Sequence, residues 1–248
     1  MRTSTVEASQ RNAAKAAGLA YLIAFALVAF VNFGIHERLF SGDPILGLVD
    51  APETARNILA HQPLFRLGIA LLLSYCVGVA VVLVAFYVIL RPFGRTIALV
   101  AAVSRVLLAA AWALGTAQLF DTLRLLNGAG DLRVFTEDQV QALASVPLSV
   151  FWDHYYVGLL FWGVSTTLFS SLWLKSQYIP RAFAAFGMAA SAWATLCAFA
   201  FIADPAFSNA VDPWWFDTPV ALFELALSVL LLVKPLSQRP GQRGLLTS

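Results

Sequence analysis

Four ionisable side chains lie in stretches of the sequence that are otherwise apolar, and they are Arg105, Asp153, His154 and Glu224. An ionisable group at bilayer depth costs from about 3 kcal/mol on insertion scales to more than about 10 kcal/mol in simulations of isolated helices. Each of them therefore requires a charged partner or a wet cavity. Carboxylate, imidazole and guanidinium groups can bind a ligand, transfer a proton or form an ion pair.

The depth of two of these charges can be estimated from the rise of a helix. Arg105 lies ten residues from Arg95, and Glu224 lies ten residues from Lys234, so each sits about 15 Å from the basic end of its span. A planar guanidinium matches a carboxylate well, and the shared depth predicts an ion pair between Arg105 and Glu224. The pair either fixes the packing of the third span on the sixth or floors a cavity that binds or protonates a ligand.

A second polar group is predicted near the outer interface. Asp153 and His154 lie about 33 Å from Lys175 by the same rise. The candidate members of this group are Arg66, Asp121, Asp153, His154 and Asn32. They form either a hydrated interfacial network or the polar mouth of an outward-facing cavity above the Arg105–Glu224 pair.

Metal binding receives little support from the spacing of the histidines. His36, His61 and His154 fall on one side of the predicted membrane together with Asp153, and three histidines with a carboxylate could hold zinc. They come from separate segments without the spacing of a zinc motif, so no metal site is predicted. The sequence also lacks a Gly-rich phosphate loop, a nucleophile elbow and a cysteine pair, and no cofactor is predicted.

Long apolar blocks must position these residues. The 248-residue chain is 60% hydrophobic and 12% charged, with a mean hydropathy of +0.77, whereas soluble domains contain about 25% charged residues. Only helices or closed barrels satisfy their backbone in lipid, so the sequence predicts an all-α bundle of about six transmembrane helices. The predicted spans are residues 16–35, 67–90, 96–120, 149–174, 182–203 and 216–233. The first lacks a cleavage site and is interpreted as an uncleaved helix.

The prediction places all six spans in a single domain, residues 16–235, between a tail at 1–15 and a tail at 236–248. With the N-terminus inside, the cytoplasmic segments hold ten Lys and Arg residues and the outer segments five. Both tails are therefore predicted to be cytoplasmic. Short amphipathic helices are expected in the outer loops, one opened by Pro52 and another begun by a capping box at Thr136 and Gln139 and broken at Pro147.

Aromatic and small residues make two further predictions. Aromatic residues near the ends of the spans are interpreted as interfacial belts rather than as a ligand cage. They are Trp152, Tyr155, Tyr156, Trp214, Trp215 and Phe216 at the outer level and Trp173 and Tyr178 at the inner level. Gly187 and Ser191, four residues apart, permit close helix packing within the chain or in a homo-oligomer.

Short motifs along the chain resemble one family. They include Gly18-Leu19-Ala20-Tyr21-Leu22, Leu64-Phe65-Arg66-Leu67-Gly68, Leu90-Arg91-Pro92, Arg105, Phe161-Trp162-Gly163, Tyr178-Ile179-Pro180-Arg181, Phe223-Glu224-Leu225 and Leu232-Val233-Lys234. Over residues 11 to 235 the chain resembles the bacterial domain-of-unknown-function family numbered 4386. The resemblance implies a six-helix protein of the bacterial cytoplasmic membrane and supplies no mechanism.

Three classes of function remain open. The favoured one is a binding or accessory membrane protein whose partners are the bilayer and a lipid-like or other apolar small molecule. One alternative is an intramembrane enzyme with Glu224 or Asp153 as general acid on an isoprenoid-like or lipid-like substrate, against which Arg105 counts by favouring the ionised form of Glu224. Another is a small transporter, for which an inverted repeat is missing. Nucleic-acid binding is excluded because the basic residues do not cluster.

Overall fold

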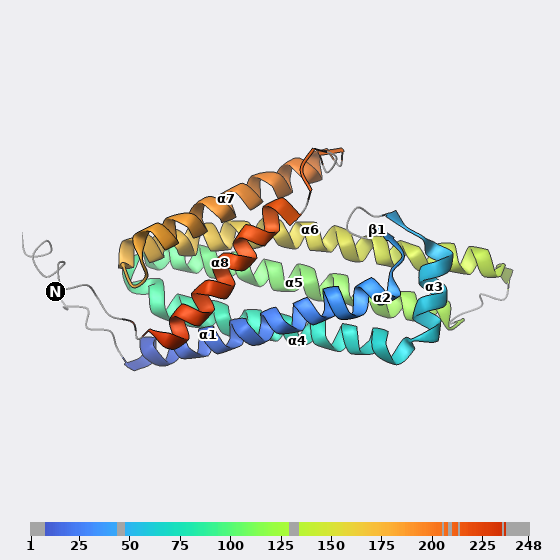
Figure 1. Ribbon diagram of the computed structural model, residues 1–248, viewed down its shortest axis with the longest axis horizontal. Coiled ribbons are helices and arrows are strands. Elements are labelled where there is room, and N and C mark those ends of the chain that lie inside the picture. The colour runs from blue at the N-terminus through green and yellow to red at the C-terminus, as the bar shows by residue number, and fades with distance from the viewer. Residues whose placement is uncertain are drawn as a thin grey trace, which may run out of the picture. The chain divides into compact units, whose positions relative to one another are not determined.

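The structure is a computed structural model that describes residues 8–43, 48–128, 134–204, 206–207, 210–212, 214–234 and 236. Figure 1 shows that these residues are almost entirely helical. The elements in chain order are α1 Ala8–Ala29, the π-helix η1 Phe30–His36, α2 Glu37–Leu39, β1 Gly42–Asp43, β2 Leu48–Val49, α3 Ala51–Ala60, α4 Gln62–Leu90, the 3-10 helix η2 Arg91–Phe93, α5 Arg95–Leu126, α6 Glu137–Ser176, α7 Arg181–Ala203 and α8 Trp214–Val233.

The predicted all-α class and the six predicted spans are confirmed. Within the described residues, six helices are long and apolar enough to cross a membrane. These helices are Ala8–Leu39, Gln62–Phe93, Arg95–Leu126, Glu137–Ser176, Arg181–Ala203 and Trp214–Val233. The first is longer than predicted at both ends, because α1 begins in the polar tail and continues through η1 and α2.

Contacts between Cα atoms divide the chain into two compact units. Unit 1 comprises Met1–Ile23, Gly78–Leu107 and Leu159–Ser248, and unit 2 comprises Ala24–Val77 and Leu108–Gly158. The predicted single domain at 16–235 stays a prediction.

Aromatic residues form the core of unit 1. The ring of Phe86 meets the rings of Phe169 and Trp173 edge to face, with centroids 5.3 and 5.5 Å apart. Trp173 is fully buried, so its ring is part of this core. At the start of α1, Gln10 donates a hydrogen bond of 3.0 Å to the carbonyl of Ile89, which holds α1 against the end of α4.

Small residues let α7 pack closely on its neighbours in unit 1. Helices α7 and α8 lie side by side, and the ring of Phe223 on α8 occupies the space where a Cβ at Gly187 would be. One turn further, the hydroxyl of Ser191 lies 2.8 Å from that of Thr167 on α6. The close packing predicted for Gly187 and Ser191 is therefore used within the chain.

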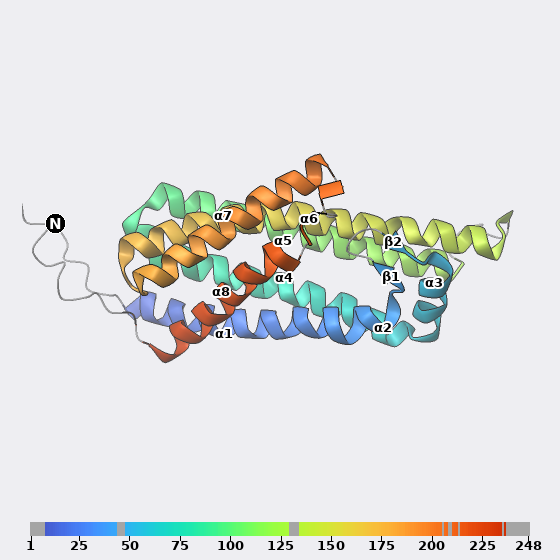
Figure 2. The same cartoon turned by 45° about the horizontal axis from the view of Figure 1, so that its top comes forward.

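In unit 2, a helix with an N-cap residue follows a pair of short antiparallel strands. Strands β1 and β2 pair antiparallel, and α3 follows them (Figure 2). The side chain of Asp50 accepts a hydrogen bond of 3.0 Å from the amide of Glu53, and Ser41 donates to the carboxylate of Glu53 at 2.7 Å. An Asp at the N-cap satisfies an amide that has no partner in the helix. The amphipathic helix predicted near Pro52 is confirmed.

The second loop helix differs from the prediction. The capping box is present, since the amide of Thr136 donates to Gln139 at 2.9 Å, but α6 then runs without a break through Pro147 to Ser176. A proline removes one backbone hydrogen bond, and a helix continues past it when neighbouring groups take up the freed carbonyls. In the turn before Pro147, the hydroxyl of Thr122 on α5 donates to the carbonyl of Ala144 at 3.3 Å.

Candidate functional site

The predicted ion pair is present in unit 1. Nη2 of Arg105 on α5 lies 2.6 Å from Oε1 of Glu224 on α8, and the two side chains are 2% and 9% exposed. Charge-assisted hydrogen bonds of this length are the strong ones. Both charges are carried by long helices, so their positions are set by packing along many turns. The role of the pair in ligand binding stays a prediction.

Two further residues complete the cluster. Nη2 of Arg105 also donates to the hydroxyl of Tyr21 on α1 at 2.9 Å and to that of Thr166 on α6 at 3.0 Å. Its guanidinium carbon lies 5.8 Å from the centre of the Tyr21 ring, within reach of a cation–π interaction. One guanidinium nitrogen carries two hydrogens and here serves three acceptors, so a hydrogen is shared. The polar cluster thus joins α1, α5, α6 and α8.

Only one oxygen of the Glu224 carboxylate accepts hydrogen bonds from the described residues. Its Oε1 accepts the bond from Arg105 and a second bond of 2.9 Å from the hydroxyl of Thr166. Its Oε2 accepts no hydrogen bond from the residues that the structure describes. A carboxylate oxygen has two lone-pair sites, so Oε2 can accept from a further donor.

The contributions of Tyr21 and Thr166 were not predicted from the sequence. Thr166 lies nine residues from Lys175, which places it about 13 to 14 Å deep and close to the estimated depth of Arg105. That signal could have identified Thr166. Tyr21 was noted only within a family motif, and its six-residue distance from Lys15 corresponds to about 9 Å, which does not single it out.

The predicted outer polar residues are not joined to one another. Asp121 pairs with Arg124 on its own helix at 3.0 Å, and Nδ1 of His154 lies 2.7 Å from the carbonyl of Val150 on its own helix. Arg66 and Asp153 are exposed, and Asn32 is half-buried. Among the described residues, no hydrogen bond or ion pair connects these five. The network or outward-facing mouth that they could form stays a prediction.

The three histidines occupy different environments. His61 is exposed at the end of α3, where its Nδ1 lies 3.1 Å from the carbonyl of Asn57, whereas His36 is buried. The described parts of the chain contain no group of three or more His, Cys, Asp or Glu side chains placed to hold a metal ion. In unit 2 the three imidazoles therefore lie apart from one another and do not form one set of metal ligands.

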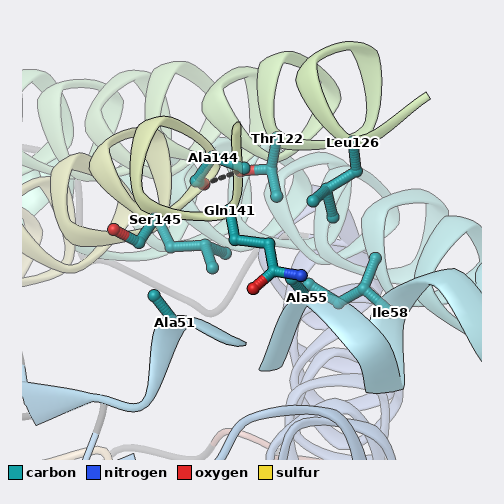
Figure 3. Close-up of a pocket in the computed structure, with 9 residues that line it drawn as sticks. Ala51, Ala55, Ile58, Thr122, Leu126, Gln141, Ala144 and Ser145 are labelled. Carbon is teal, nitrogen blue, oxygen red and sulfur yellow. Dashed lines mark hydrogen bonds between the residues drawn. The ribbon is translucent and has the colours of Figure 1, made fainter. Parts of the chain in front are cut away.

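A small hollow lies in unit 2 between α3, α5 and α6 (Figure 3). Its empty volume is about 160 Å³, part of which is open solvent. Gln141 is the largest polar side chain of its lining, and the bond from Thr122 to Ala144 borders it. The lining residues are Ala51, Ala55, Ile58, Thr122, Leu126, Gln141, Ala144, Ser145 and Leu148. None of them is charged, and none belongs to the predicted sites.

Comparison with known families identifies a match over most of the chain. The model of the family described as "Domain of unknown function (DUF4386)" matches residues 16–234. No curated protein and no solved structure matches the chain.

Proposed function

The chain belongs to the DUF4386 family, whose description assigns no activity. We therefore propose a function from the polar cluster of unit 1. The protein is a binding or accessory protein of the bacterial cytoplasmic membrane with both tails in the cytoplasm. Its ligand is a lipid-like small molecule that reaches the cluster from the outer side. The bilayer is its other partner.

The observation that carries this proposal is the unused oxygen Oε2 of Glu224. Arg105 and Thr166 both donate to Oε1, so the cluster holds the carboxylate in place and leaves one acceptor for another molecule. A ligand that supplies a hydroxyl or amine hydrogen would complete it. Inside a membrane-spanning helix, such a donor is strongly favoured over none, because a charged group in an apolar surrounding needs every available hydrogen bond.

The same contacts favour binding over acid catalysis. A general acid must carry the proton that it donates, whereas Glu224 accepts from two donors, one of them a guanidinium. The proposal therefore gives Glu224 the role of a ligand-binding residue.

The test is a Glu224→Gln variant, which replaces one carboxylate oxygen by an amide NH₂ group. The amide carbonyl of the glutamine can take the place of Oε1 and still accept from Arg105 and Thr166. Its NH₂ group then stands where Oε2 was, and a donor replaces the acceptor. The exposed Asp138, in the first turn of α6, provides the matched control Asp138→Asn.

The three proteins are purified in lipid nanodiscs, and the bound small molecules are extracted and identified by mass spectrometry against empty nanodiscs. We expect the wild type and the Asp138→Asn variant to retain a hydroxyl-bearing or amine-bearing lipid-like molecule that the Glu224→Gln variant loses. Equal retention by all three proteins would refute the proposal, and so would a wild-type extract identical to that of empty nanodiscs. Thermal unfolding of the same samples shows whether the Glu224→Gln variant is folded.

A further inference from the structure

His36 occupies an unusual position in unit 2, at the end of the π-helix η1. In a π-helix the backbone hydrogen bonds join residues five apart instead of four, and such segments occur often at functional sites. Its last two residues, Ile35 and His36, both lie in the protein interior, where they are 0% and 6% exposed.

Aromatic rings enclose the imidazole of His36. The Phe40 ring lies nearly parallel to it, with a centroid distance of 4.7 Å and an interplanar angle of 30°. The rings of Phe151 and Trp152, both on α6, meet it edge to face at 5.9 and 6.0 Å. Trp152 is buried, with 7% of its surface exposed. The rings around His36 are uncharged, which favours a neutral partner.

Two buried nitrogens in this cluster have no hydrogen-bond partner among the described residues. They are Nδ1 of His36 and Nε1 of Trp152. Buried polar atoms in proteins are bonded in the great majority of cases, and an exception calls for an unseen partner. The indole nitrogen can only donate, so one partner that serves both rings must be an acceptor. His36 must then carry its hydrogen on Nδ1.

We propose that His36 and Trp152 bind the carbonyl oxygen of a neutral, lipid-soluble molecule. Both residues belong to helices that are long and apolar enough to cross a membrane, which favours a ligand that is soluble in the bilayer. A carbonyl oxygen has two lone pairs and can accept from both N–H groups at once. This chemistry has two sources in a membrane, the ester carbonyl of a phospholipid and the ring carbonyl of a quinone. The site is separate from Glu224 and stands without the function proposed above.

The test uses the full chain labelled with ¹⁵N at its three histidines and at the tryptophan indoles. Spectra are recorded in bilayers of diester phosphatidylcholine, in bilayers of diether phosphatidylcholine, which lacks the carbonyl, and in diether bilayers with decylubiquinone. His36→Gln and Trp152→Phe variants assign the two resonances. His61 is the internal control, because its Nδ1 is already bonded within its own helix.

A change of the His36 Nδ1 and Trp152 Nε1 resonances between diester and diether bilayers would support the phospholipid ester as the ligand. A change of both only when decylubiquinone is added would support the quinone. In either case His61 should be unchanged, and Trp152→Phe should abolish the change at His36. Identical resonances in all three bilayers would overturn the proposal, as would equal shifts at all histidines or a His36 shift that persists in folded Trp152→Phe protein. If the Trp152→Phe variant does not fold, the wild type decides. Its Trp152 Nε1 resonance must then shift in the same bilayer as the His36 Nδ1 resonance, and a shift of only one of them would refute the binding of both groups to one oxygen.

Discussion

Replacing Arg105 by Met and Glu224 by Leu, singly and together, tests how the buried pair contributes to stability. The two atoms lie 2.6 Å apart, and both side chains are at least nine-tenths buried. Removal of one partner leaves the other charge without compensation, which costs about 3–5 kcal/mol in a protein interior. Replacement of both by apolar residues of similar volume is often neutral or stabilising by about 1–4 kcal/mol. We therefore expect each single variant to be strongly destabilised and the double variant to recover most of the loss.

The free energy of unfolding is measured in mixed micelles at increasing fractions of SDS, followed by tryptophan fluorescence. The double-mutant cycle should give a coupling energy of about 3 kcal/mol or more. Tyr21→Phe removes only one acceptor of a charged donor and should cost about 1.5–3 kcal/mol. The exposed Arg66 provides a control, since Arg66→Gln should change stability by less than about 0.5 kcal/mol. Single variants within about 1 kcal/mol of the wild type, or effects that simply add in the double variant, would refute the reasoning.

Three further predictions concern packing, capping and orientation. Gly187→Ala should lower the free energy of unfolding by about 1–3 kcal/mol in the same micelle assay, because the new Cβ meets the ring of Phe223; an unchanged value would contradict the packing of α7 on α8. Asp50→Ala removes the N-cap of α3 at a cost of about 1 kcal/mol, and amide hydrogen exchange of α3 should accelerate while that of α8 does not. In a variant without the native cysteines, an impermeant maleimide added to intact cells should label Asp138→Cys and spare Lys234→Cys; the reverse pattern would contradict cytoplasmic tails.

Hydropathy predicted the six spans because the thickness of a bilayer demands about 20 apolar residues in each. The ends were less well predicted. The first helix begins at Ala8 in a polar tail, since helical hydrogen bonding does not stop where the apolar stretch stops. Pro147 was expected to end a helix, but a proline within a long helix costs one backbone hydrogen bond, and α6 continues through it.

The pairing of Arg105 with Glu224 was predictable because charges are rare in apolar spans and their depth follows from the helical rise. Depth, however, says nothing about which way a helix is turned. Tyr21 and Thr166 are ordinary in a membrane helix, and their place in the cluster depends on the rotation of α1 and α6. That rotation is set by the packing of whole helices, which the linear sequence does not display.

The Arg105–Glu224 cluster and the His36–Trp152 cluster differ in how their polar groups are partnered, and the physical cost of leaving each group without a partner explains the difference. A charge in an apolar interior is so unfavourable that the protein must supply its partner, and Arg105 accordingly has Glu224, Thr166 and Tyr21 within 3.0 Å. A neutral N–H that lacks a partner costs far less, so a fold can tolerate it until a ligand arrives. His36 and Trp152 are groups of this kind. The charged cluster therefore holds helices together before any ligand binds, and a ligand would add a donor only at Oε2 of Glu224, whereas both nitrogens of the neutral cluster need an acceptor from outside the described residues.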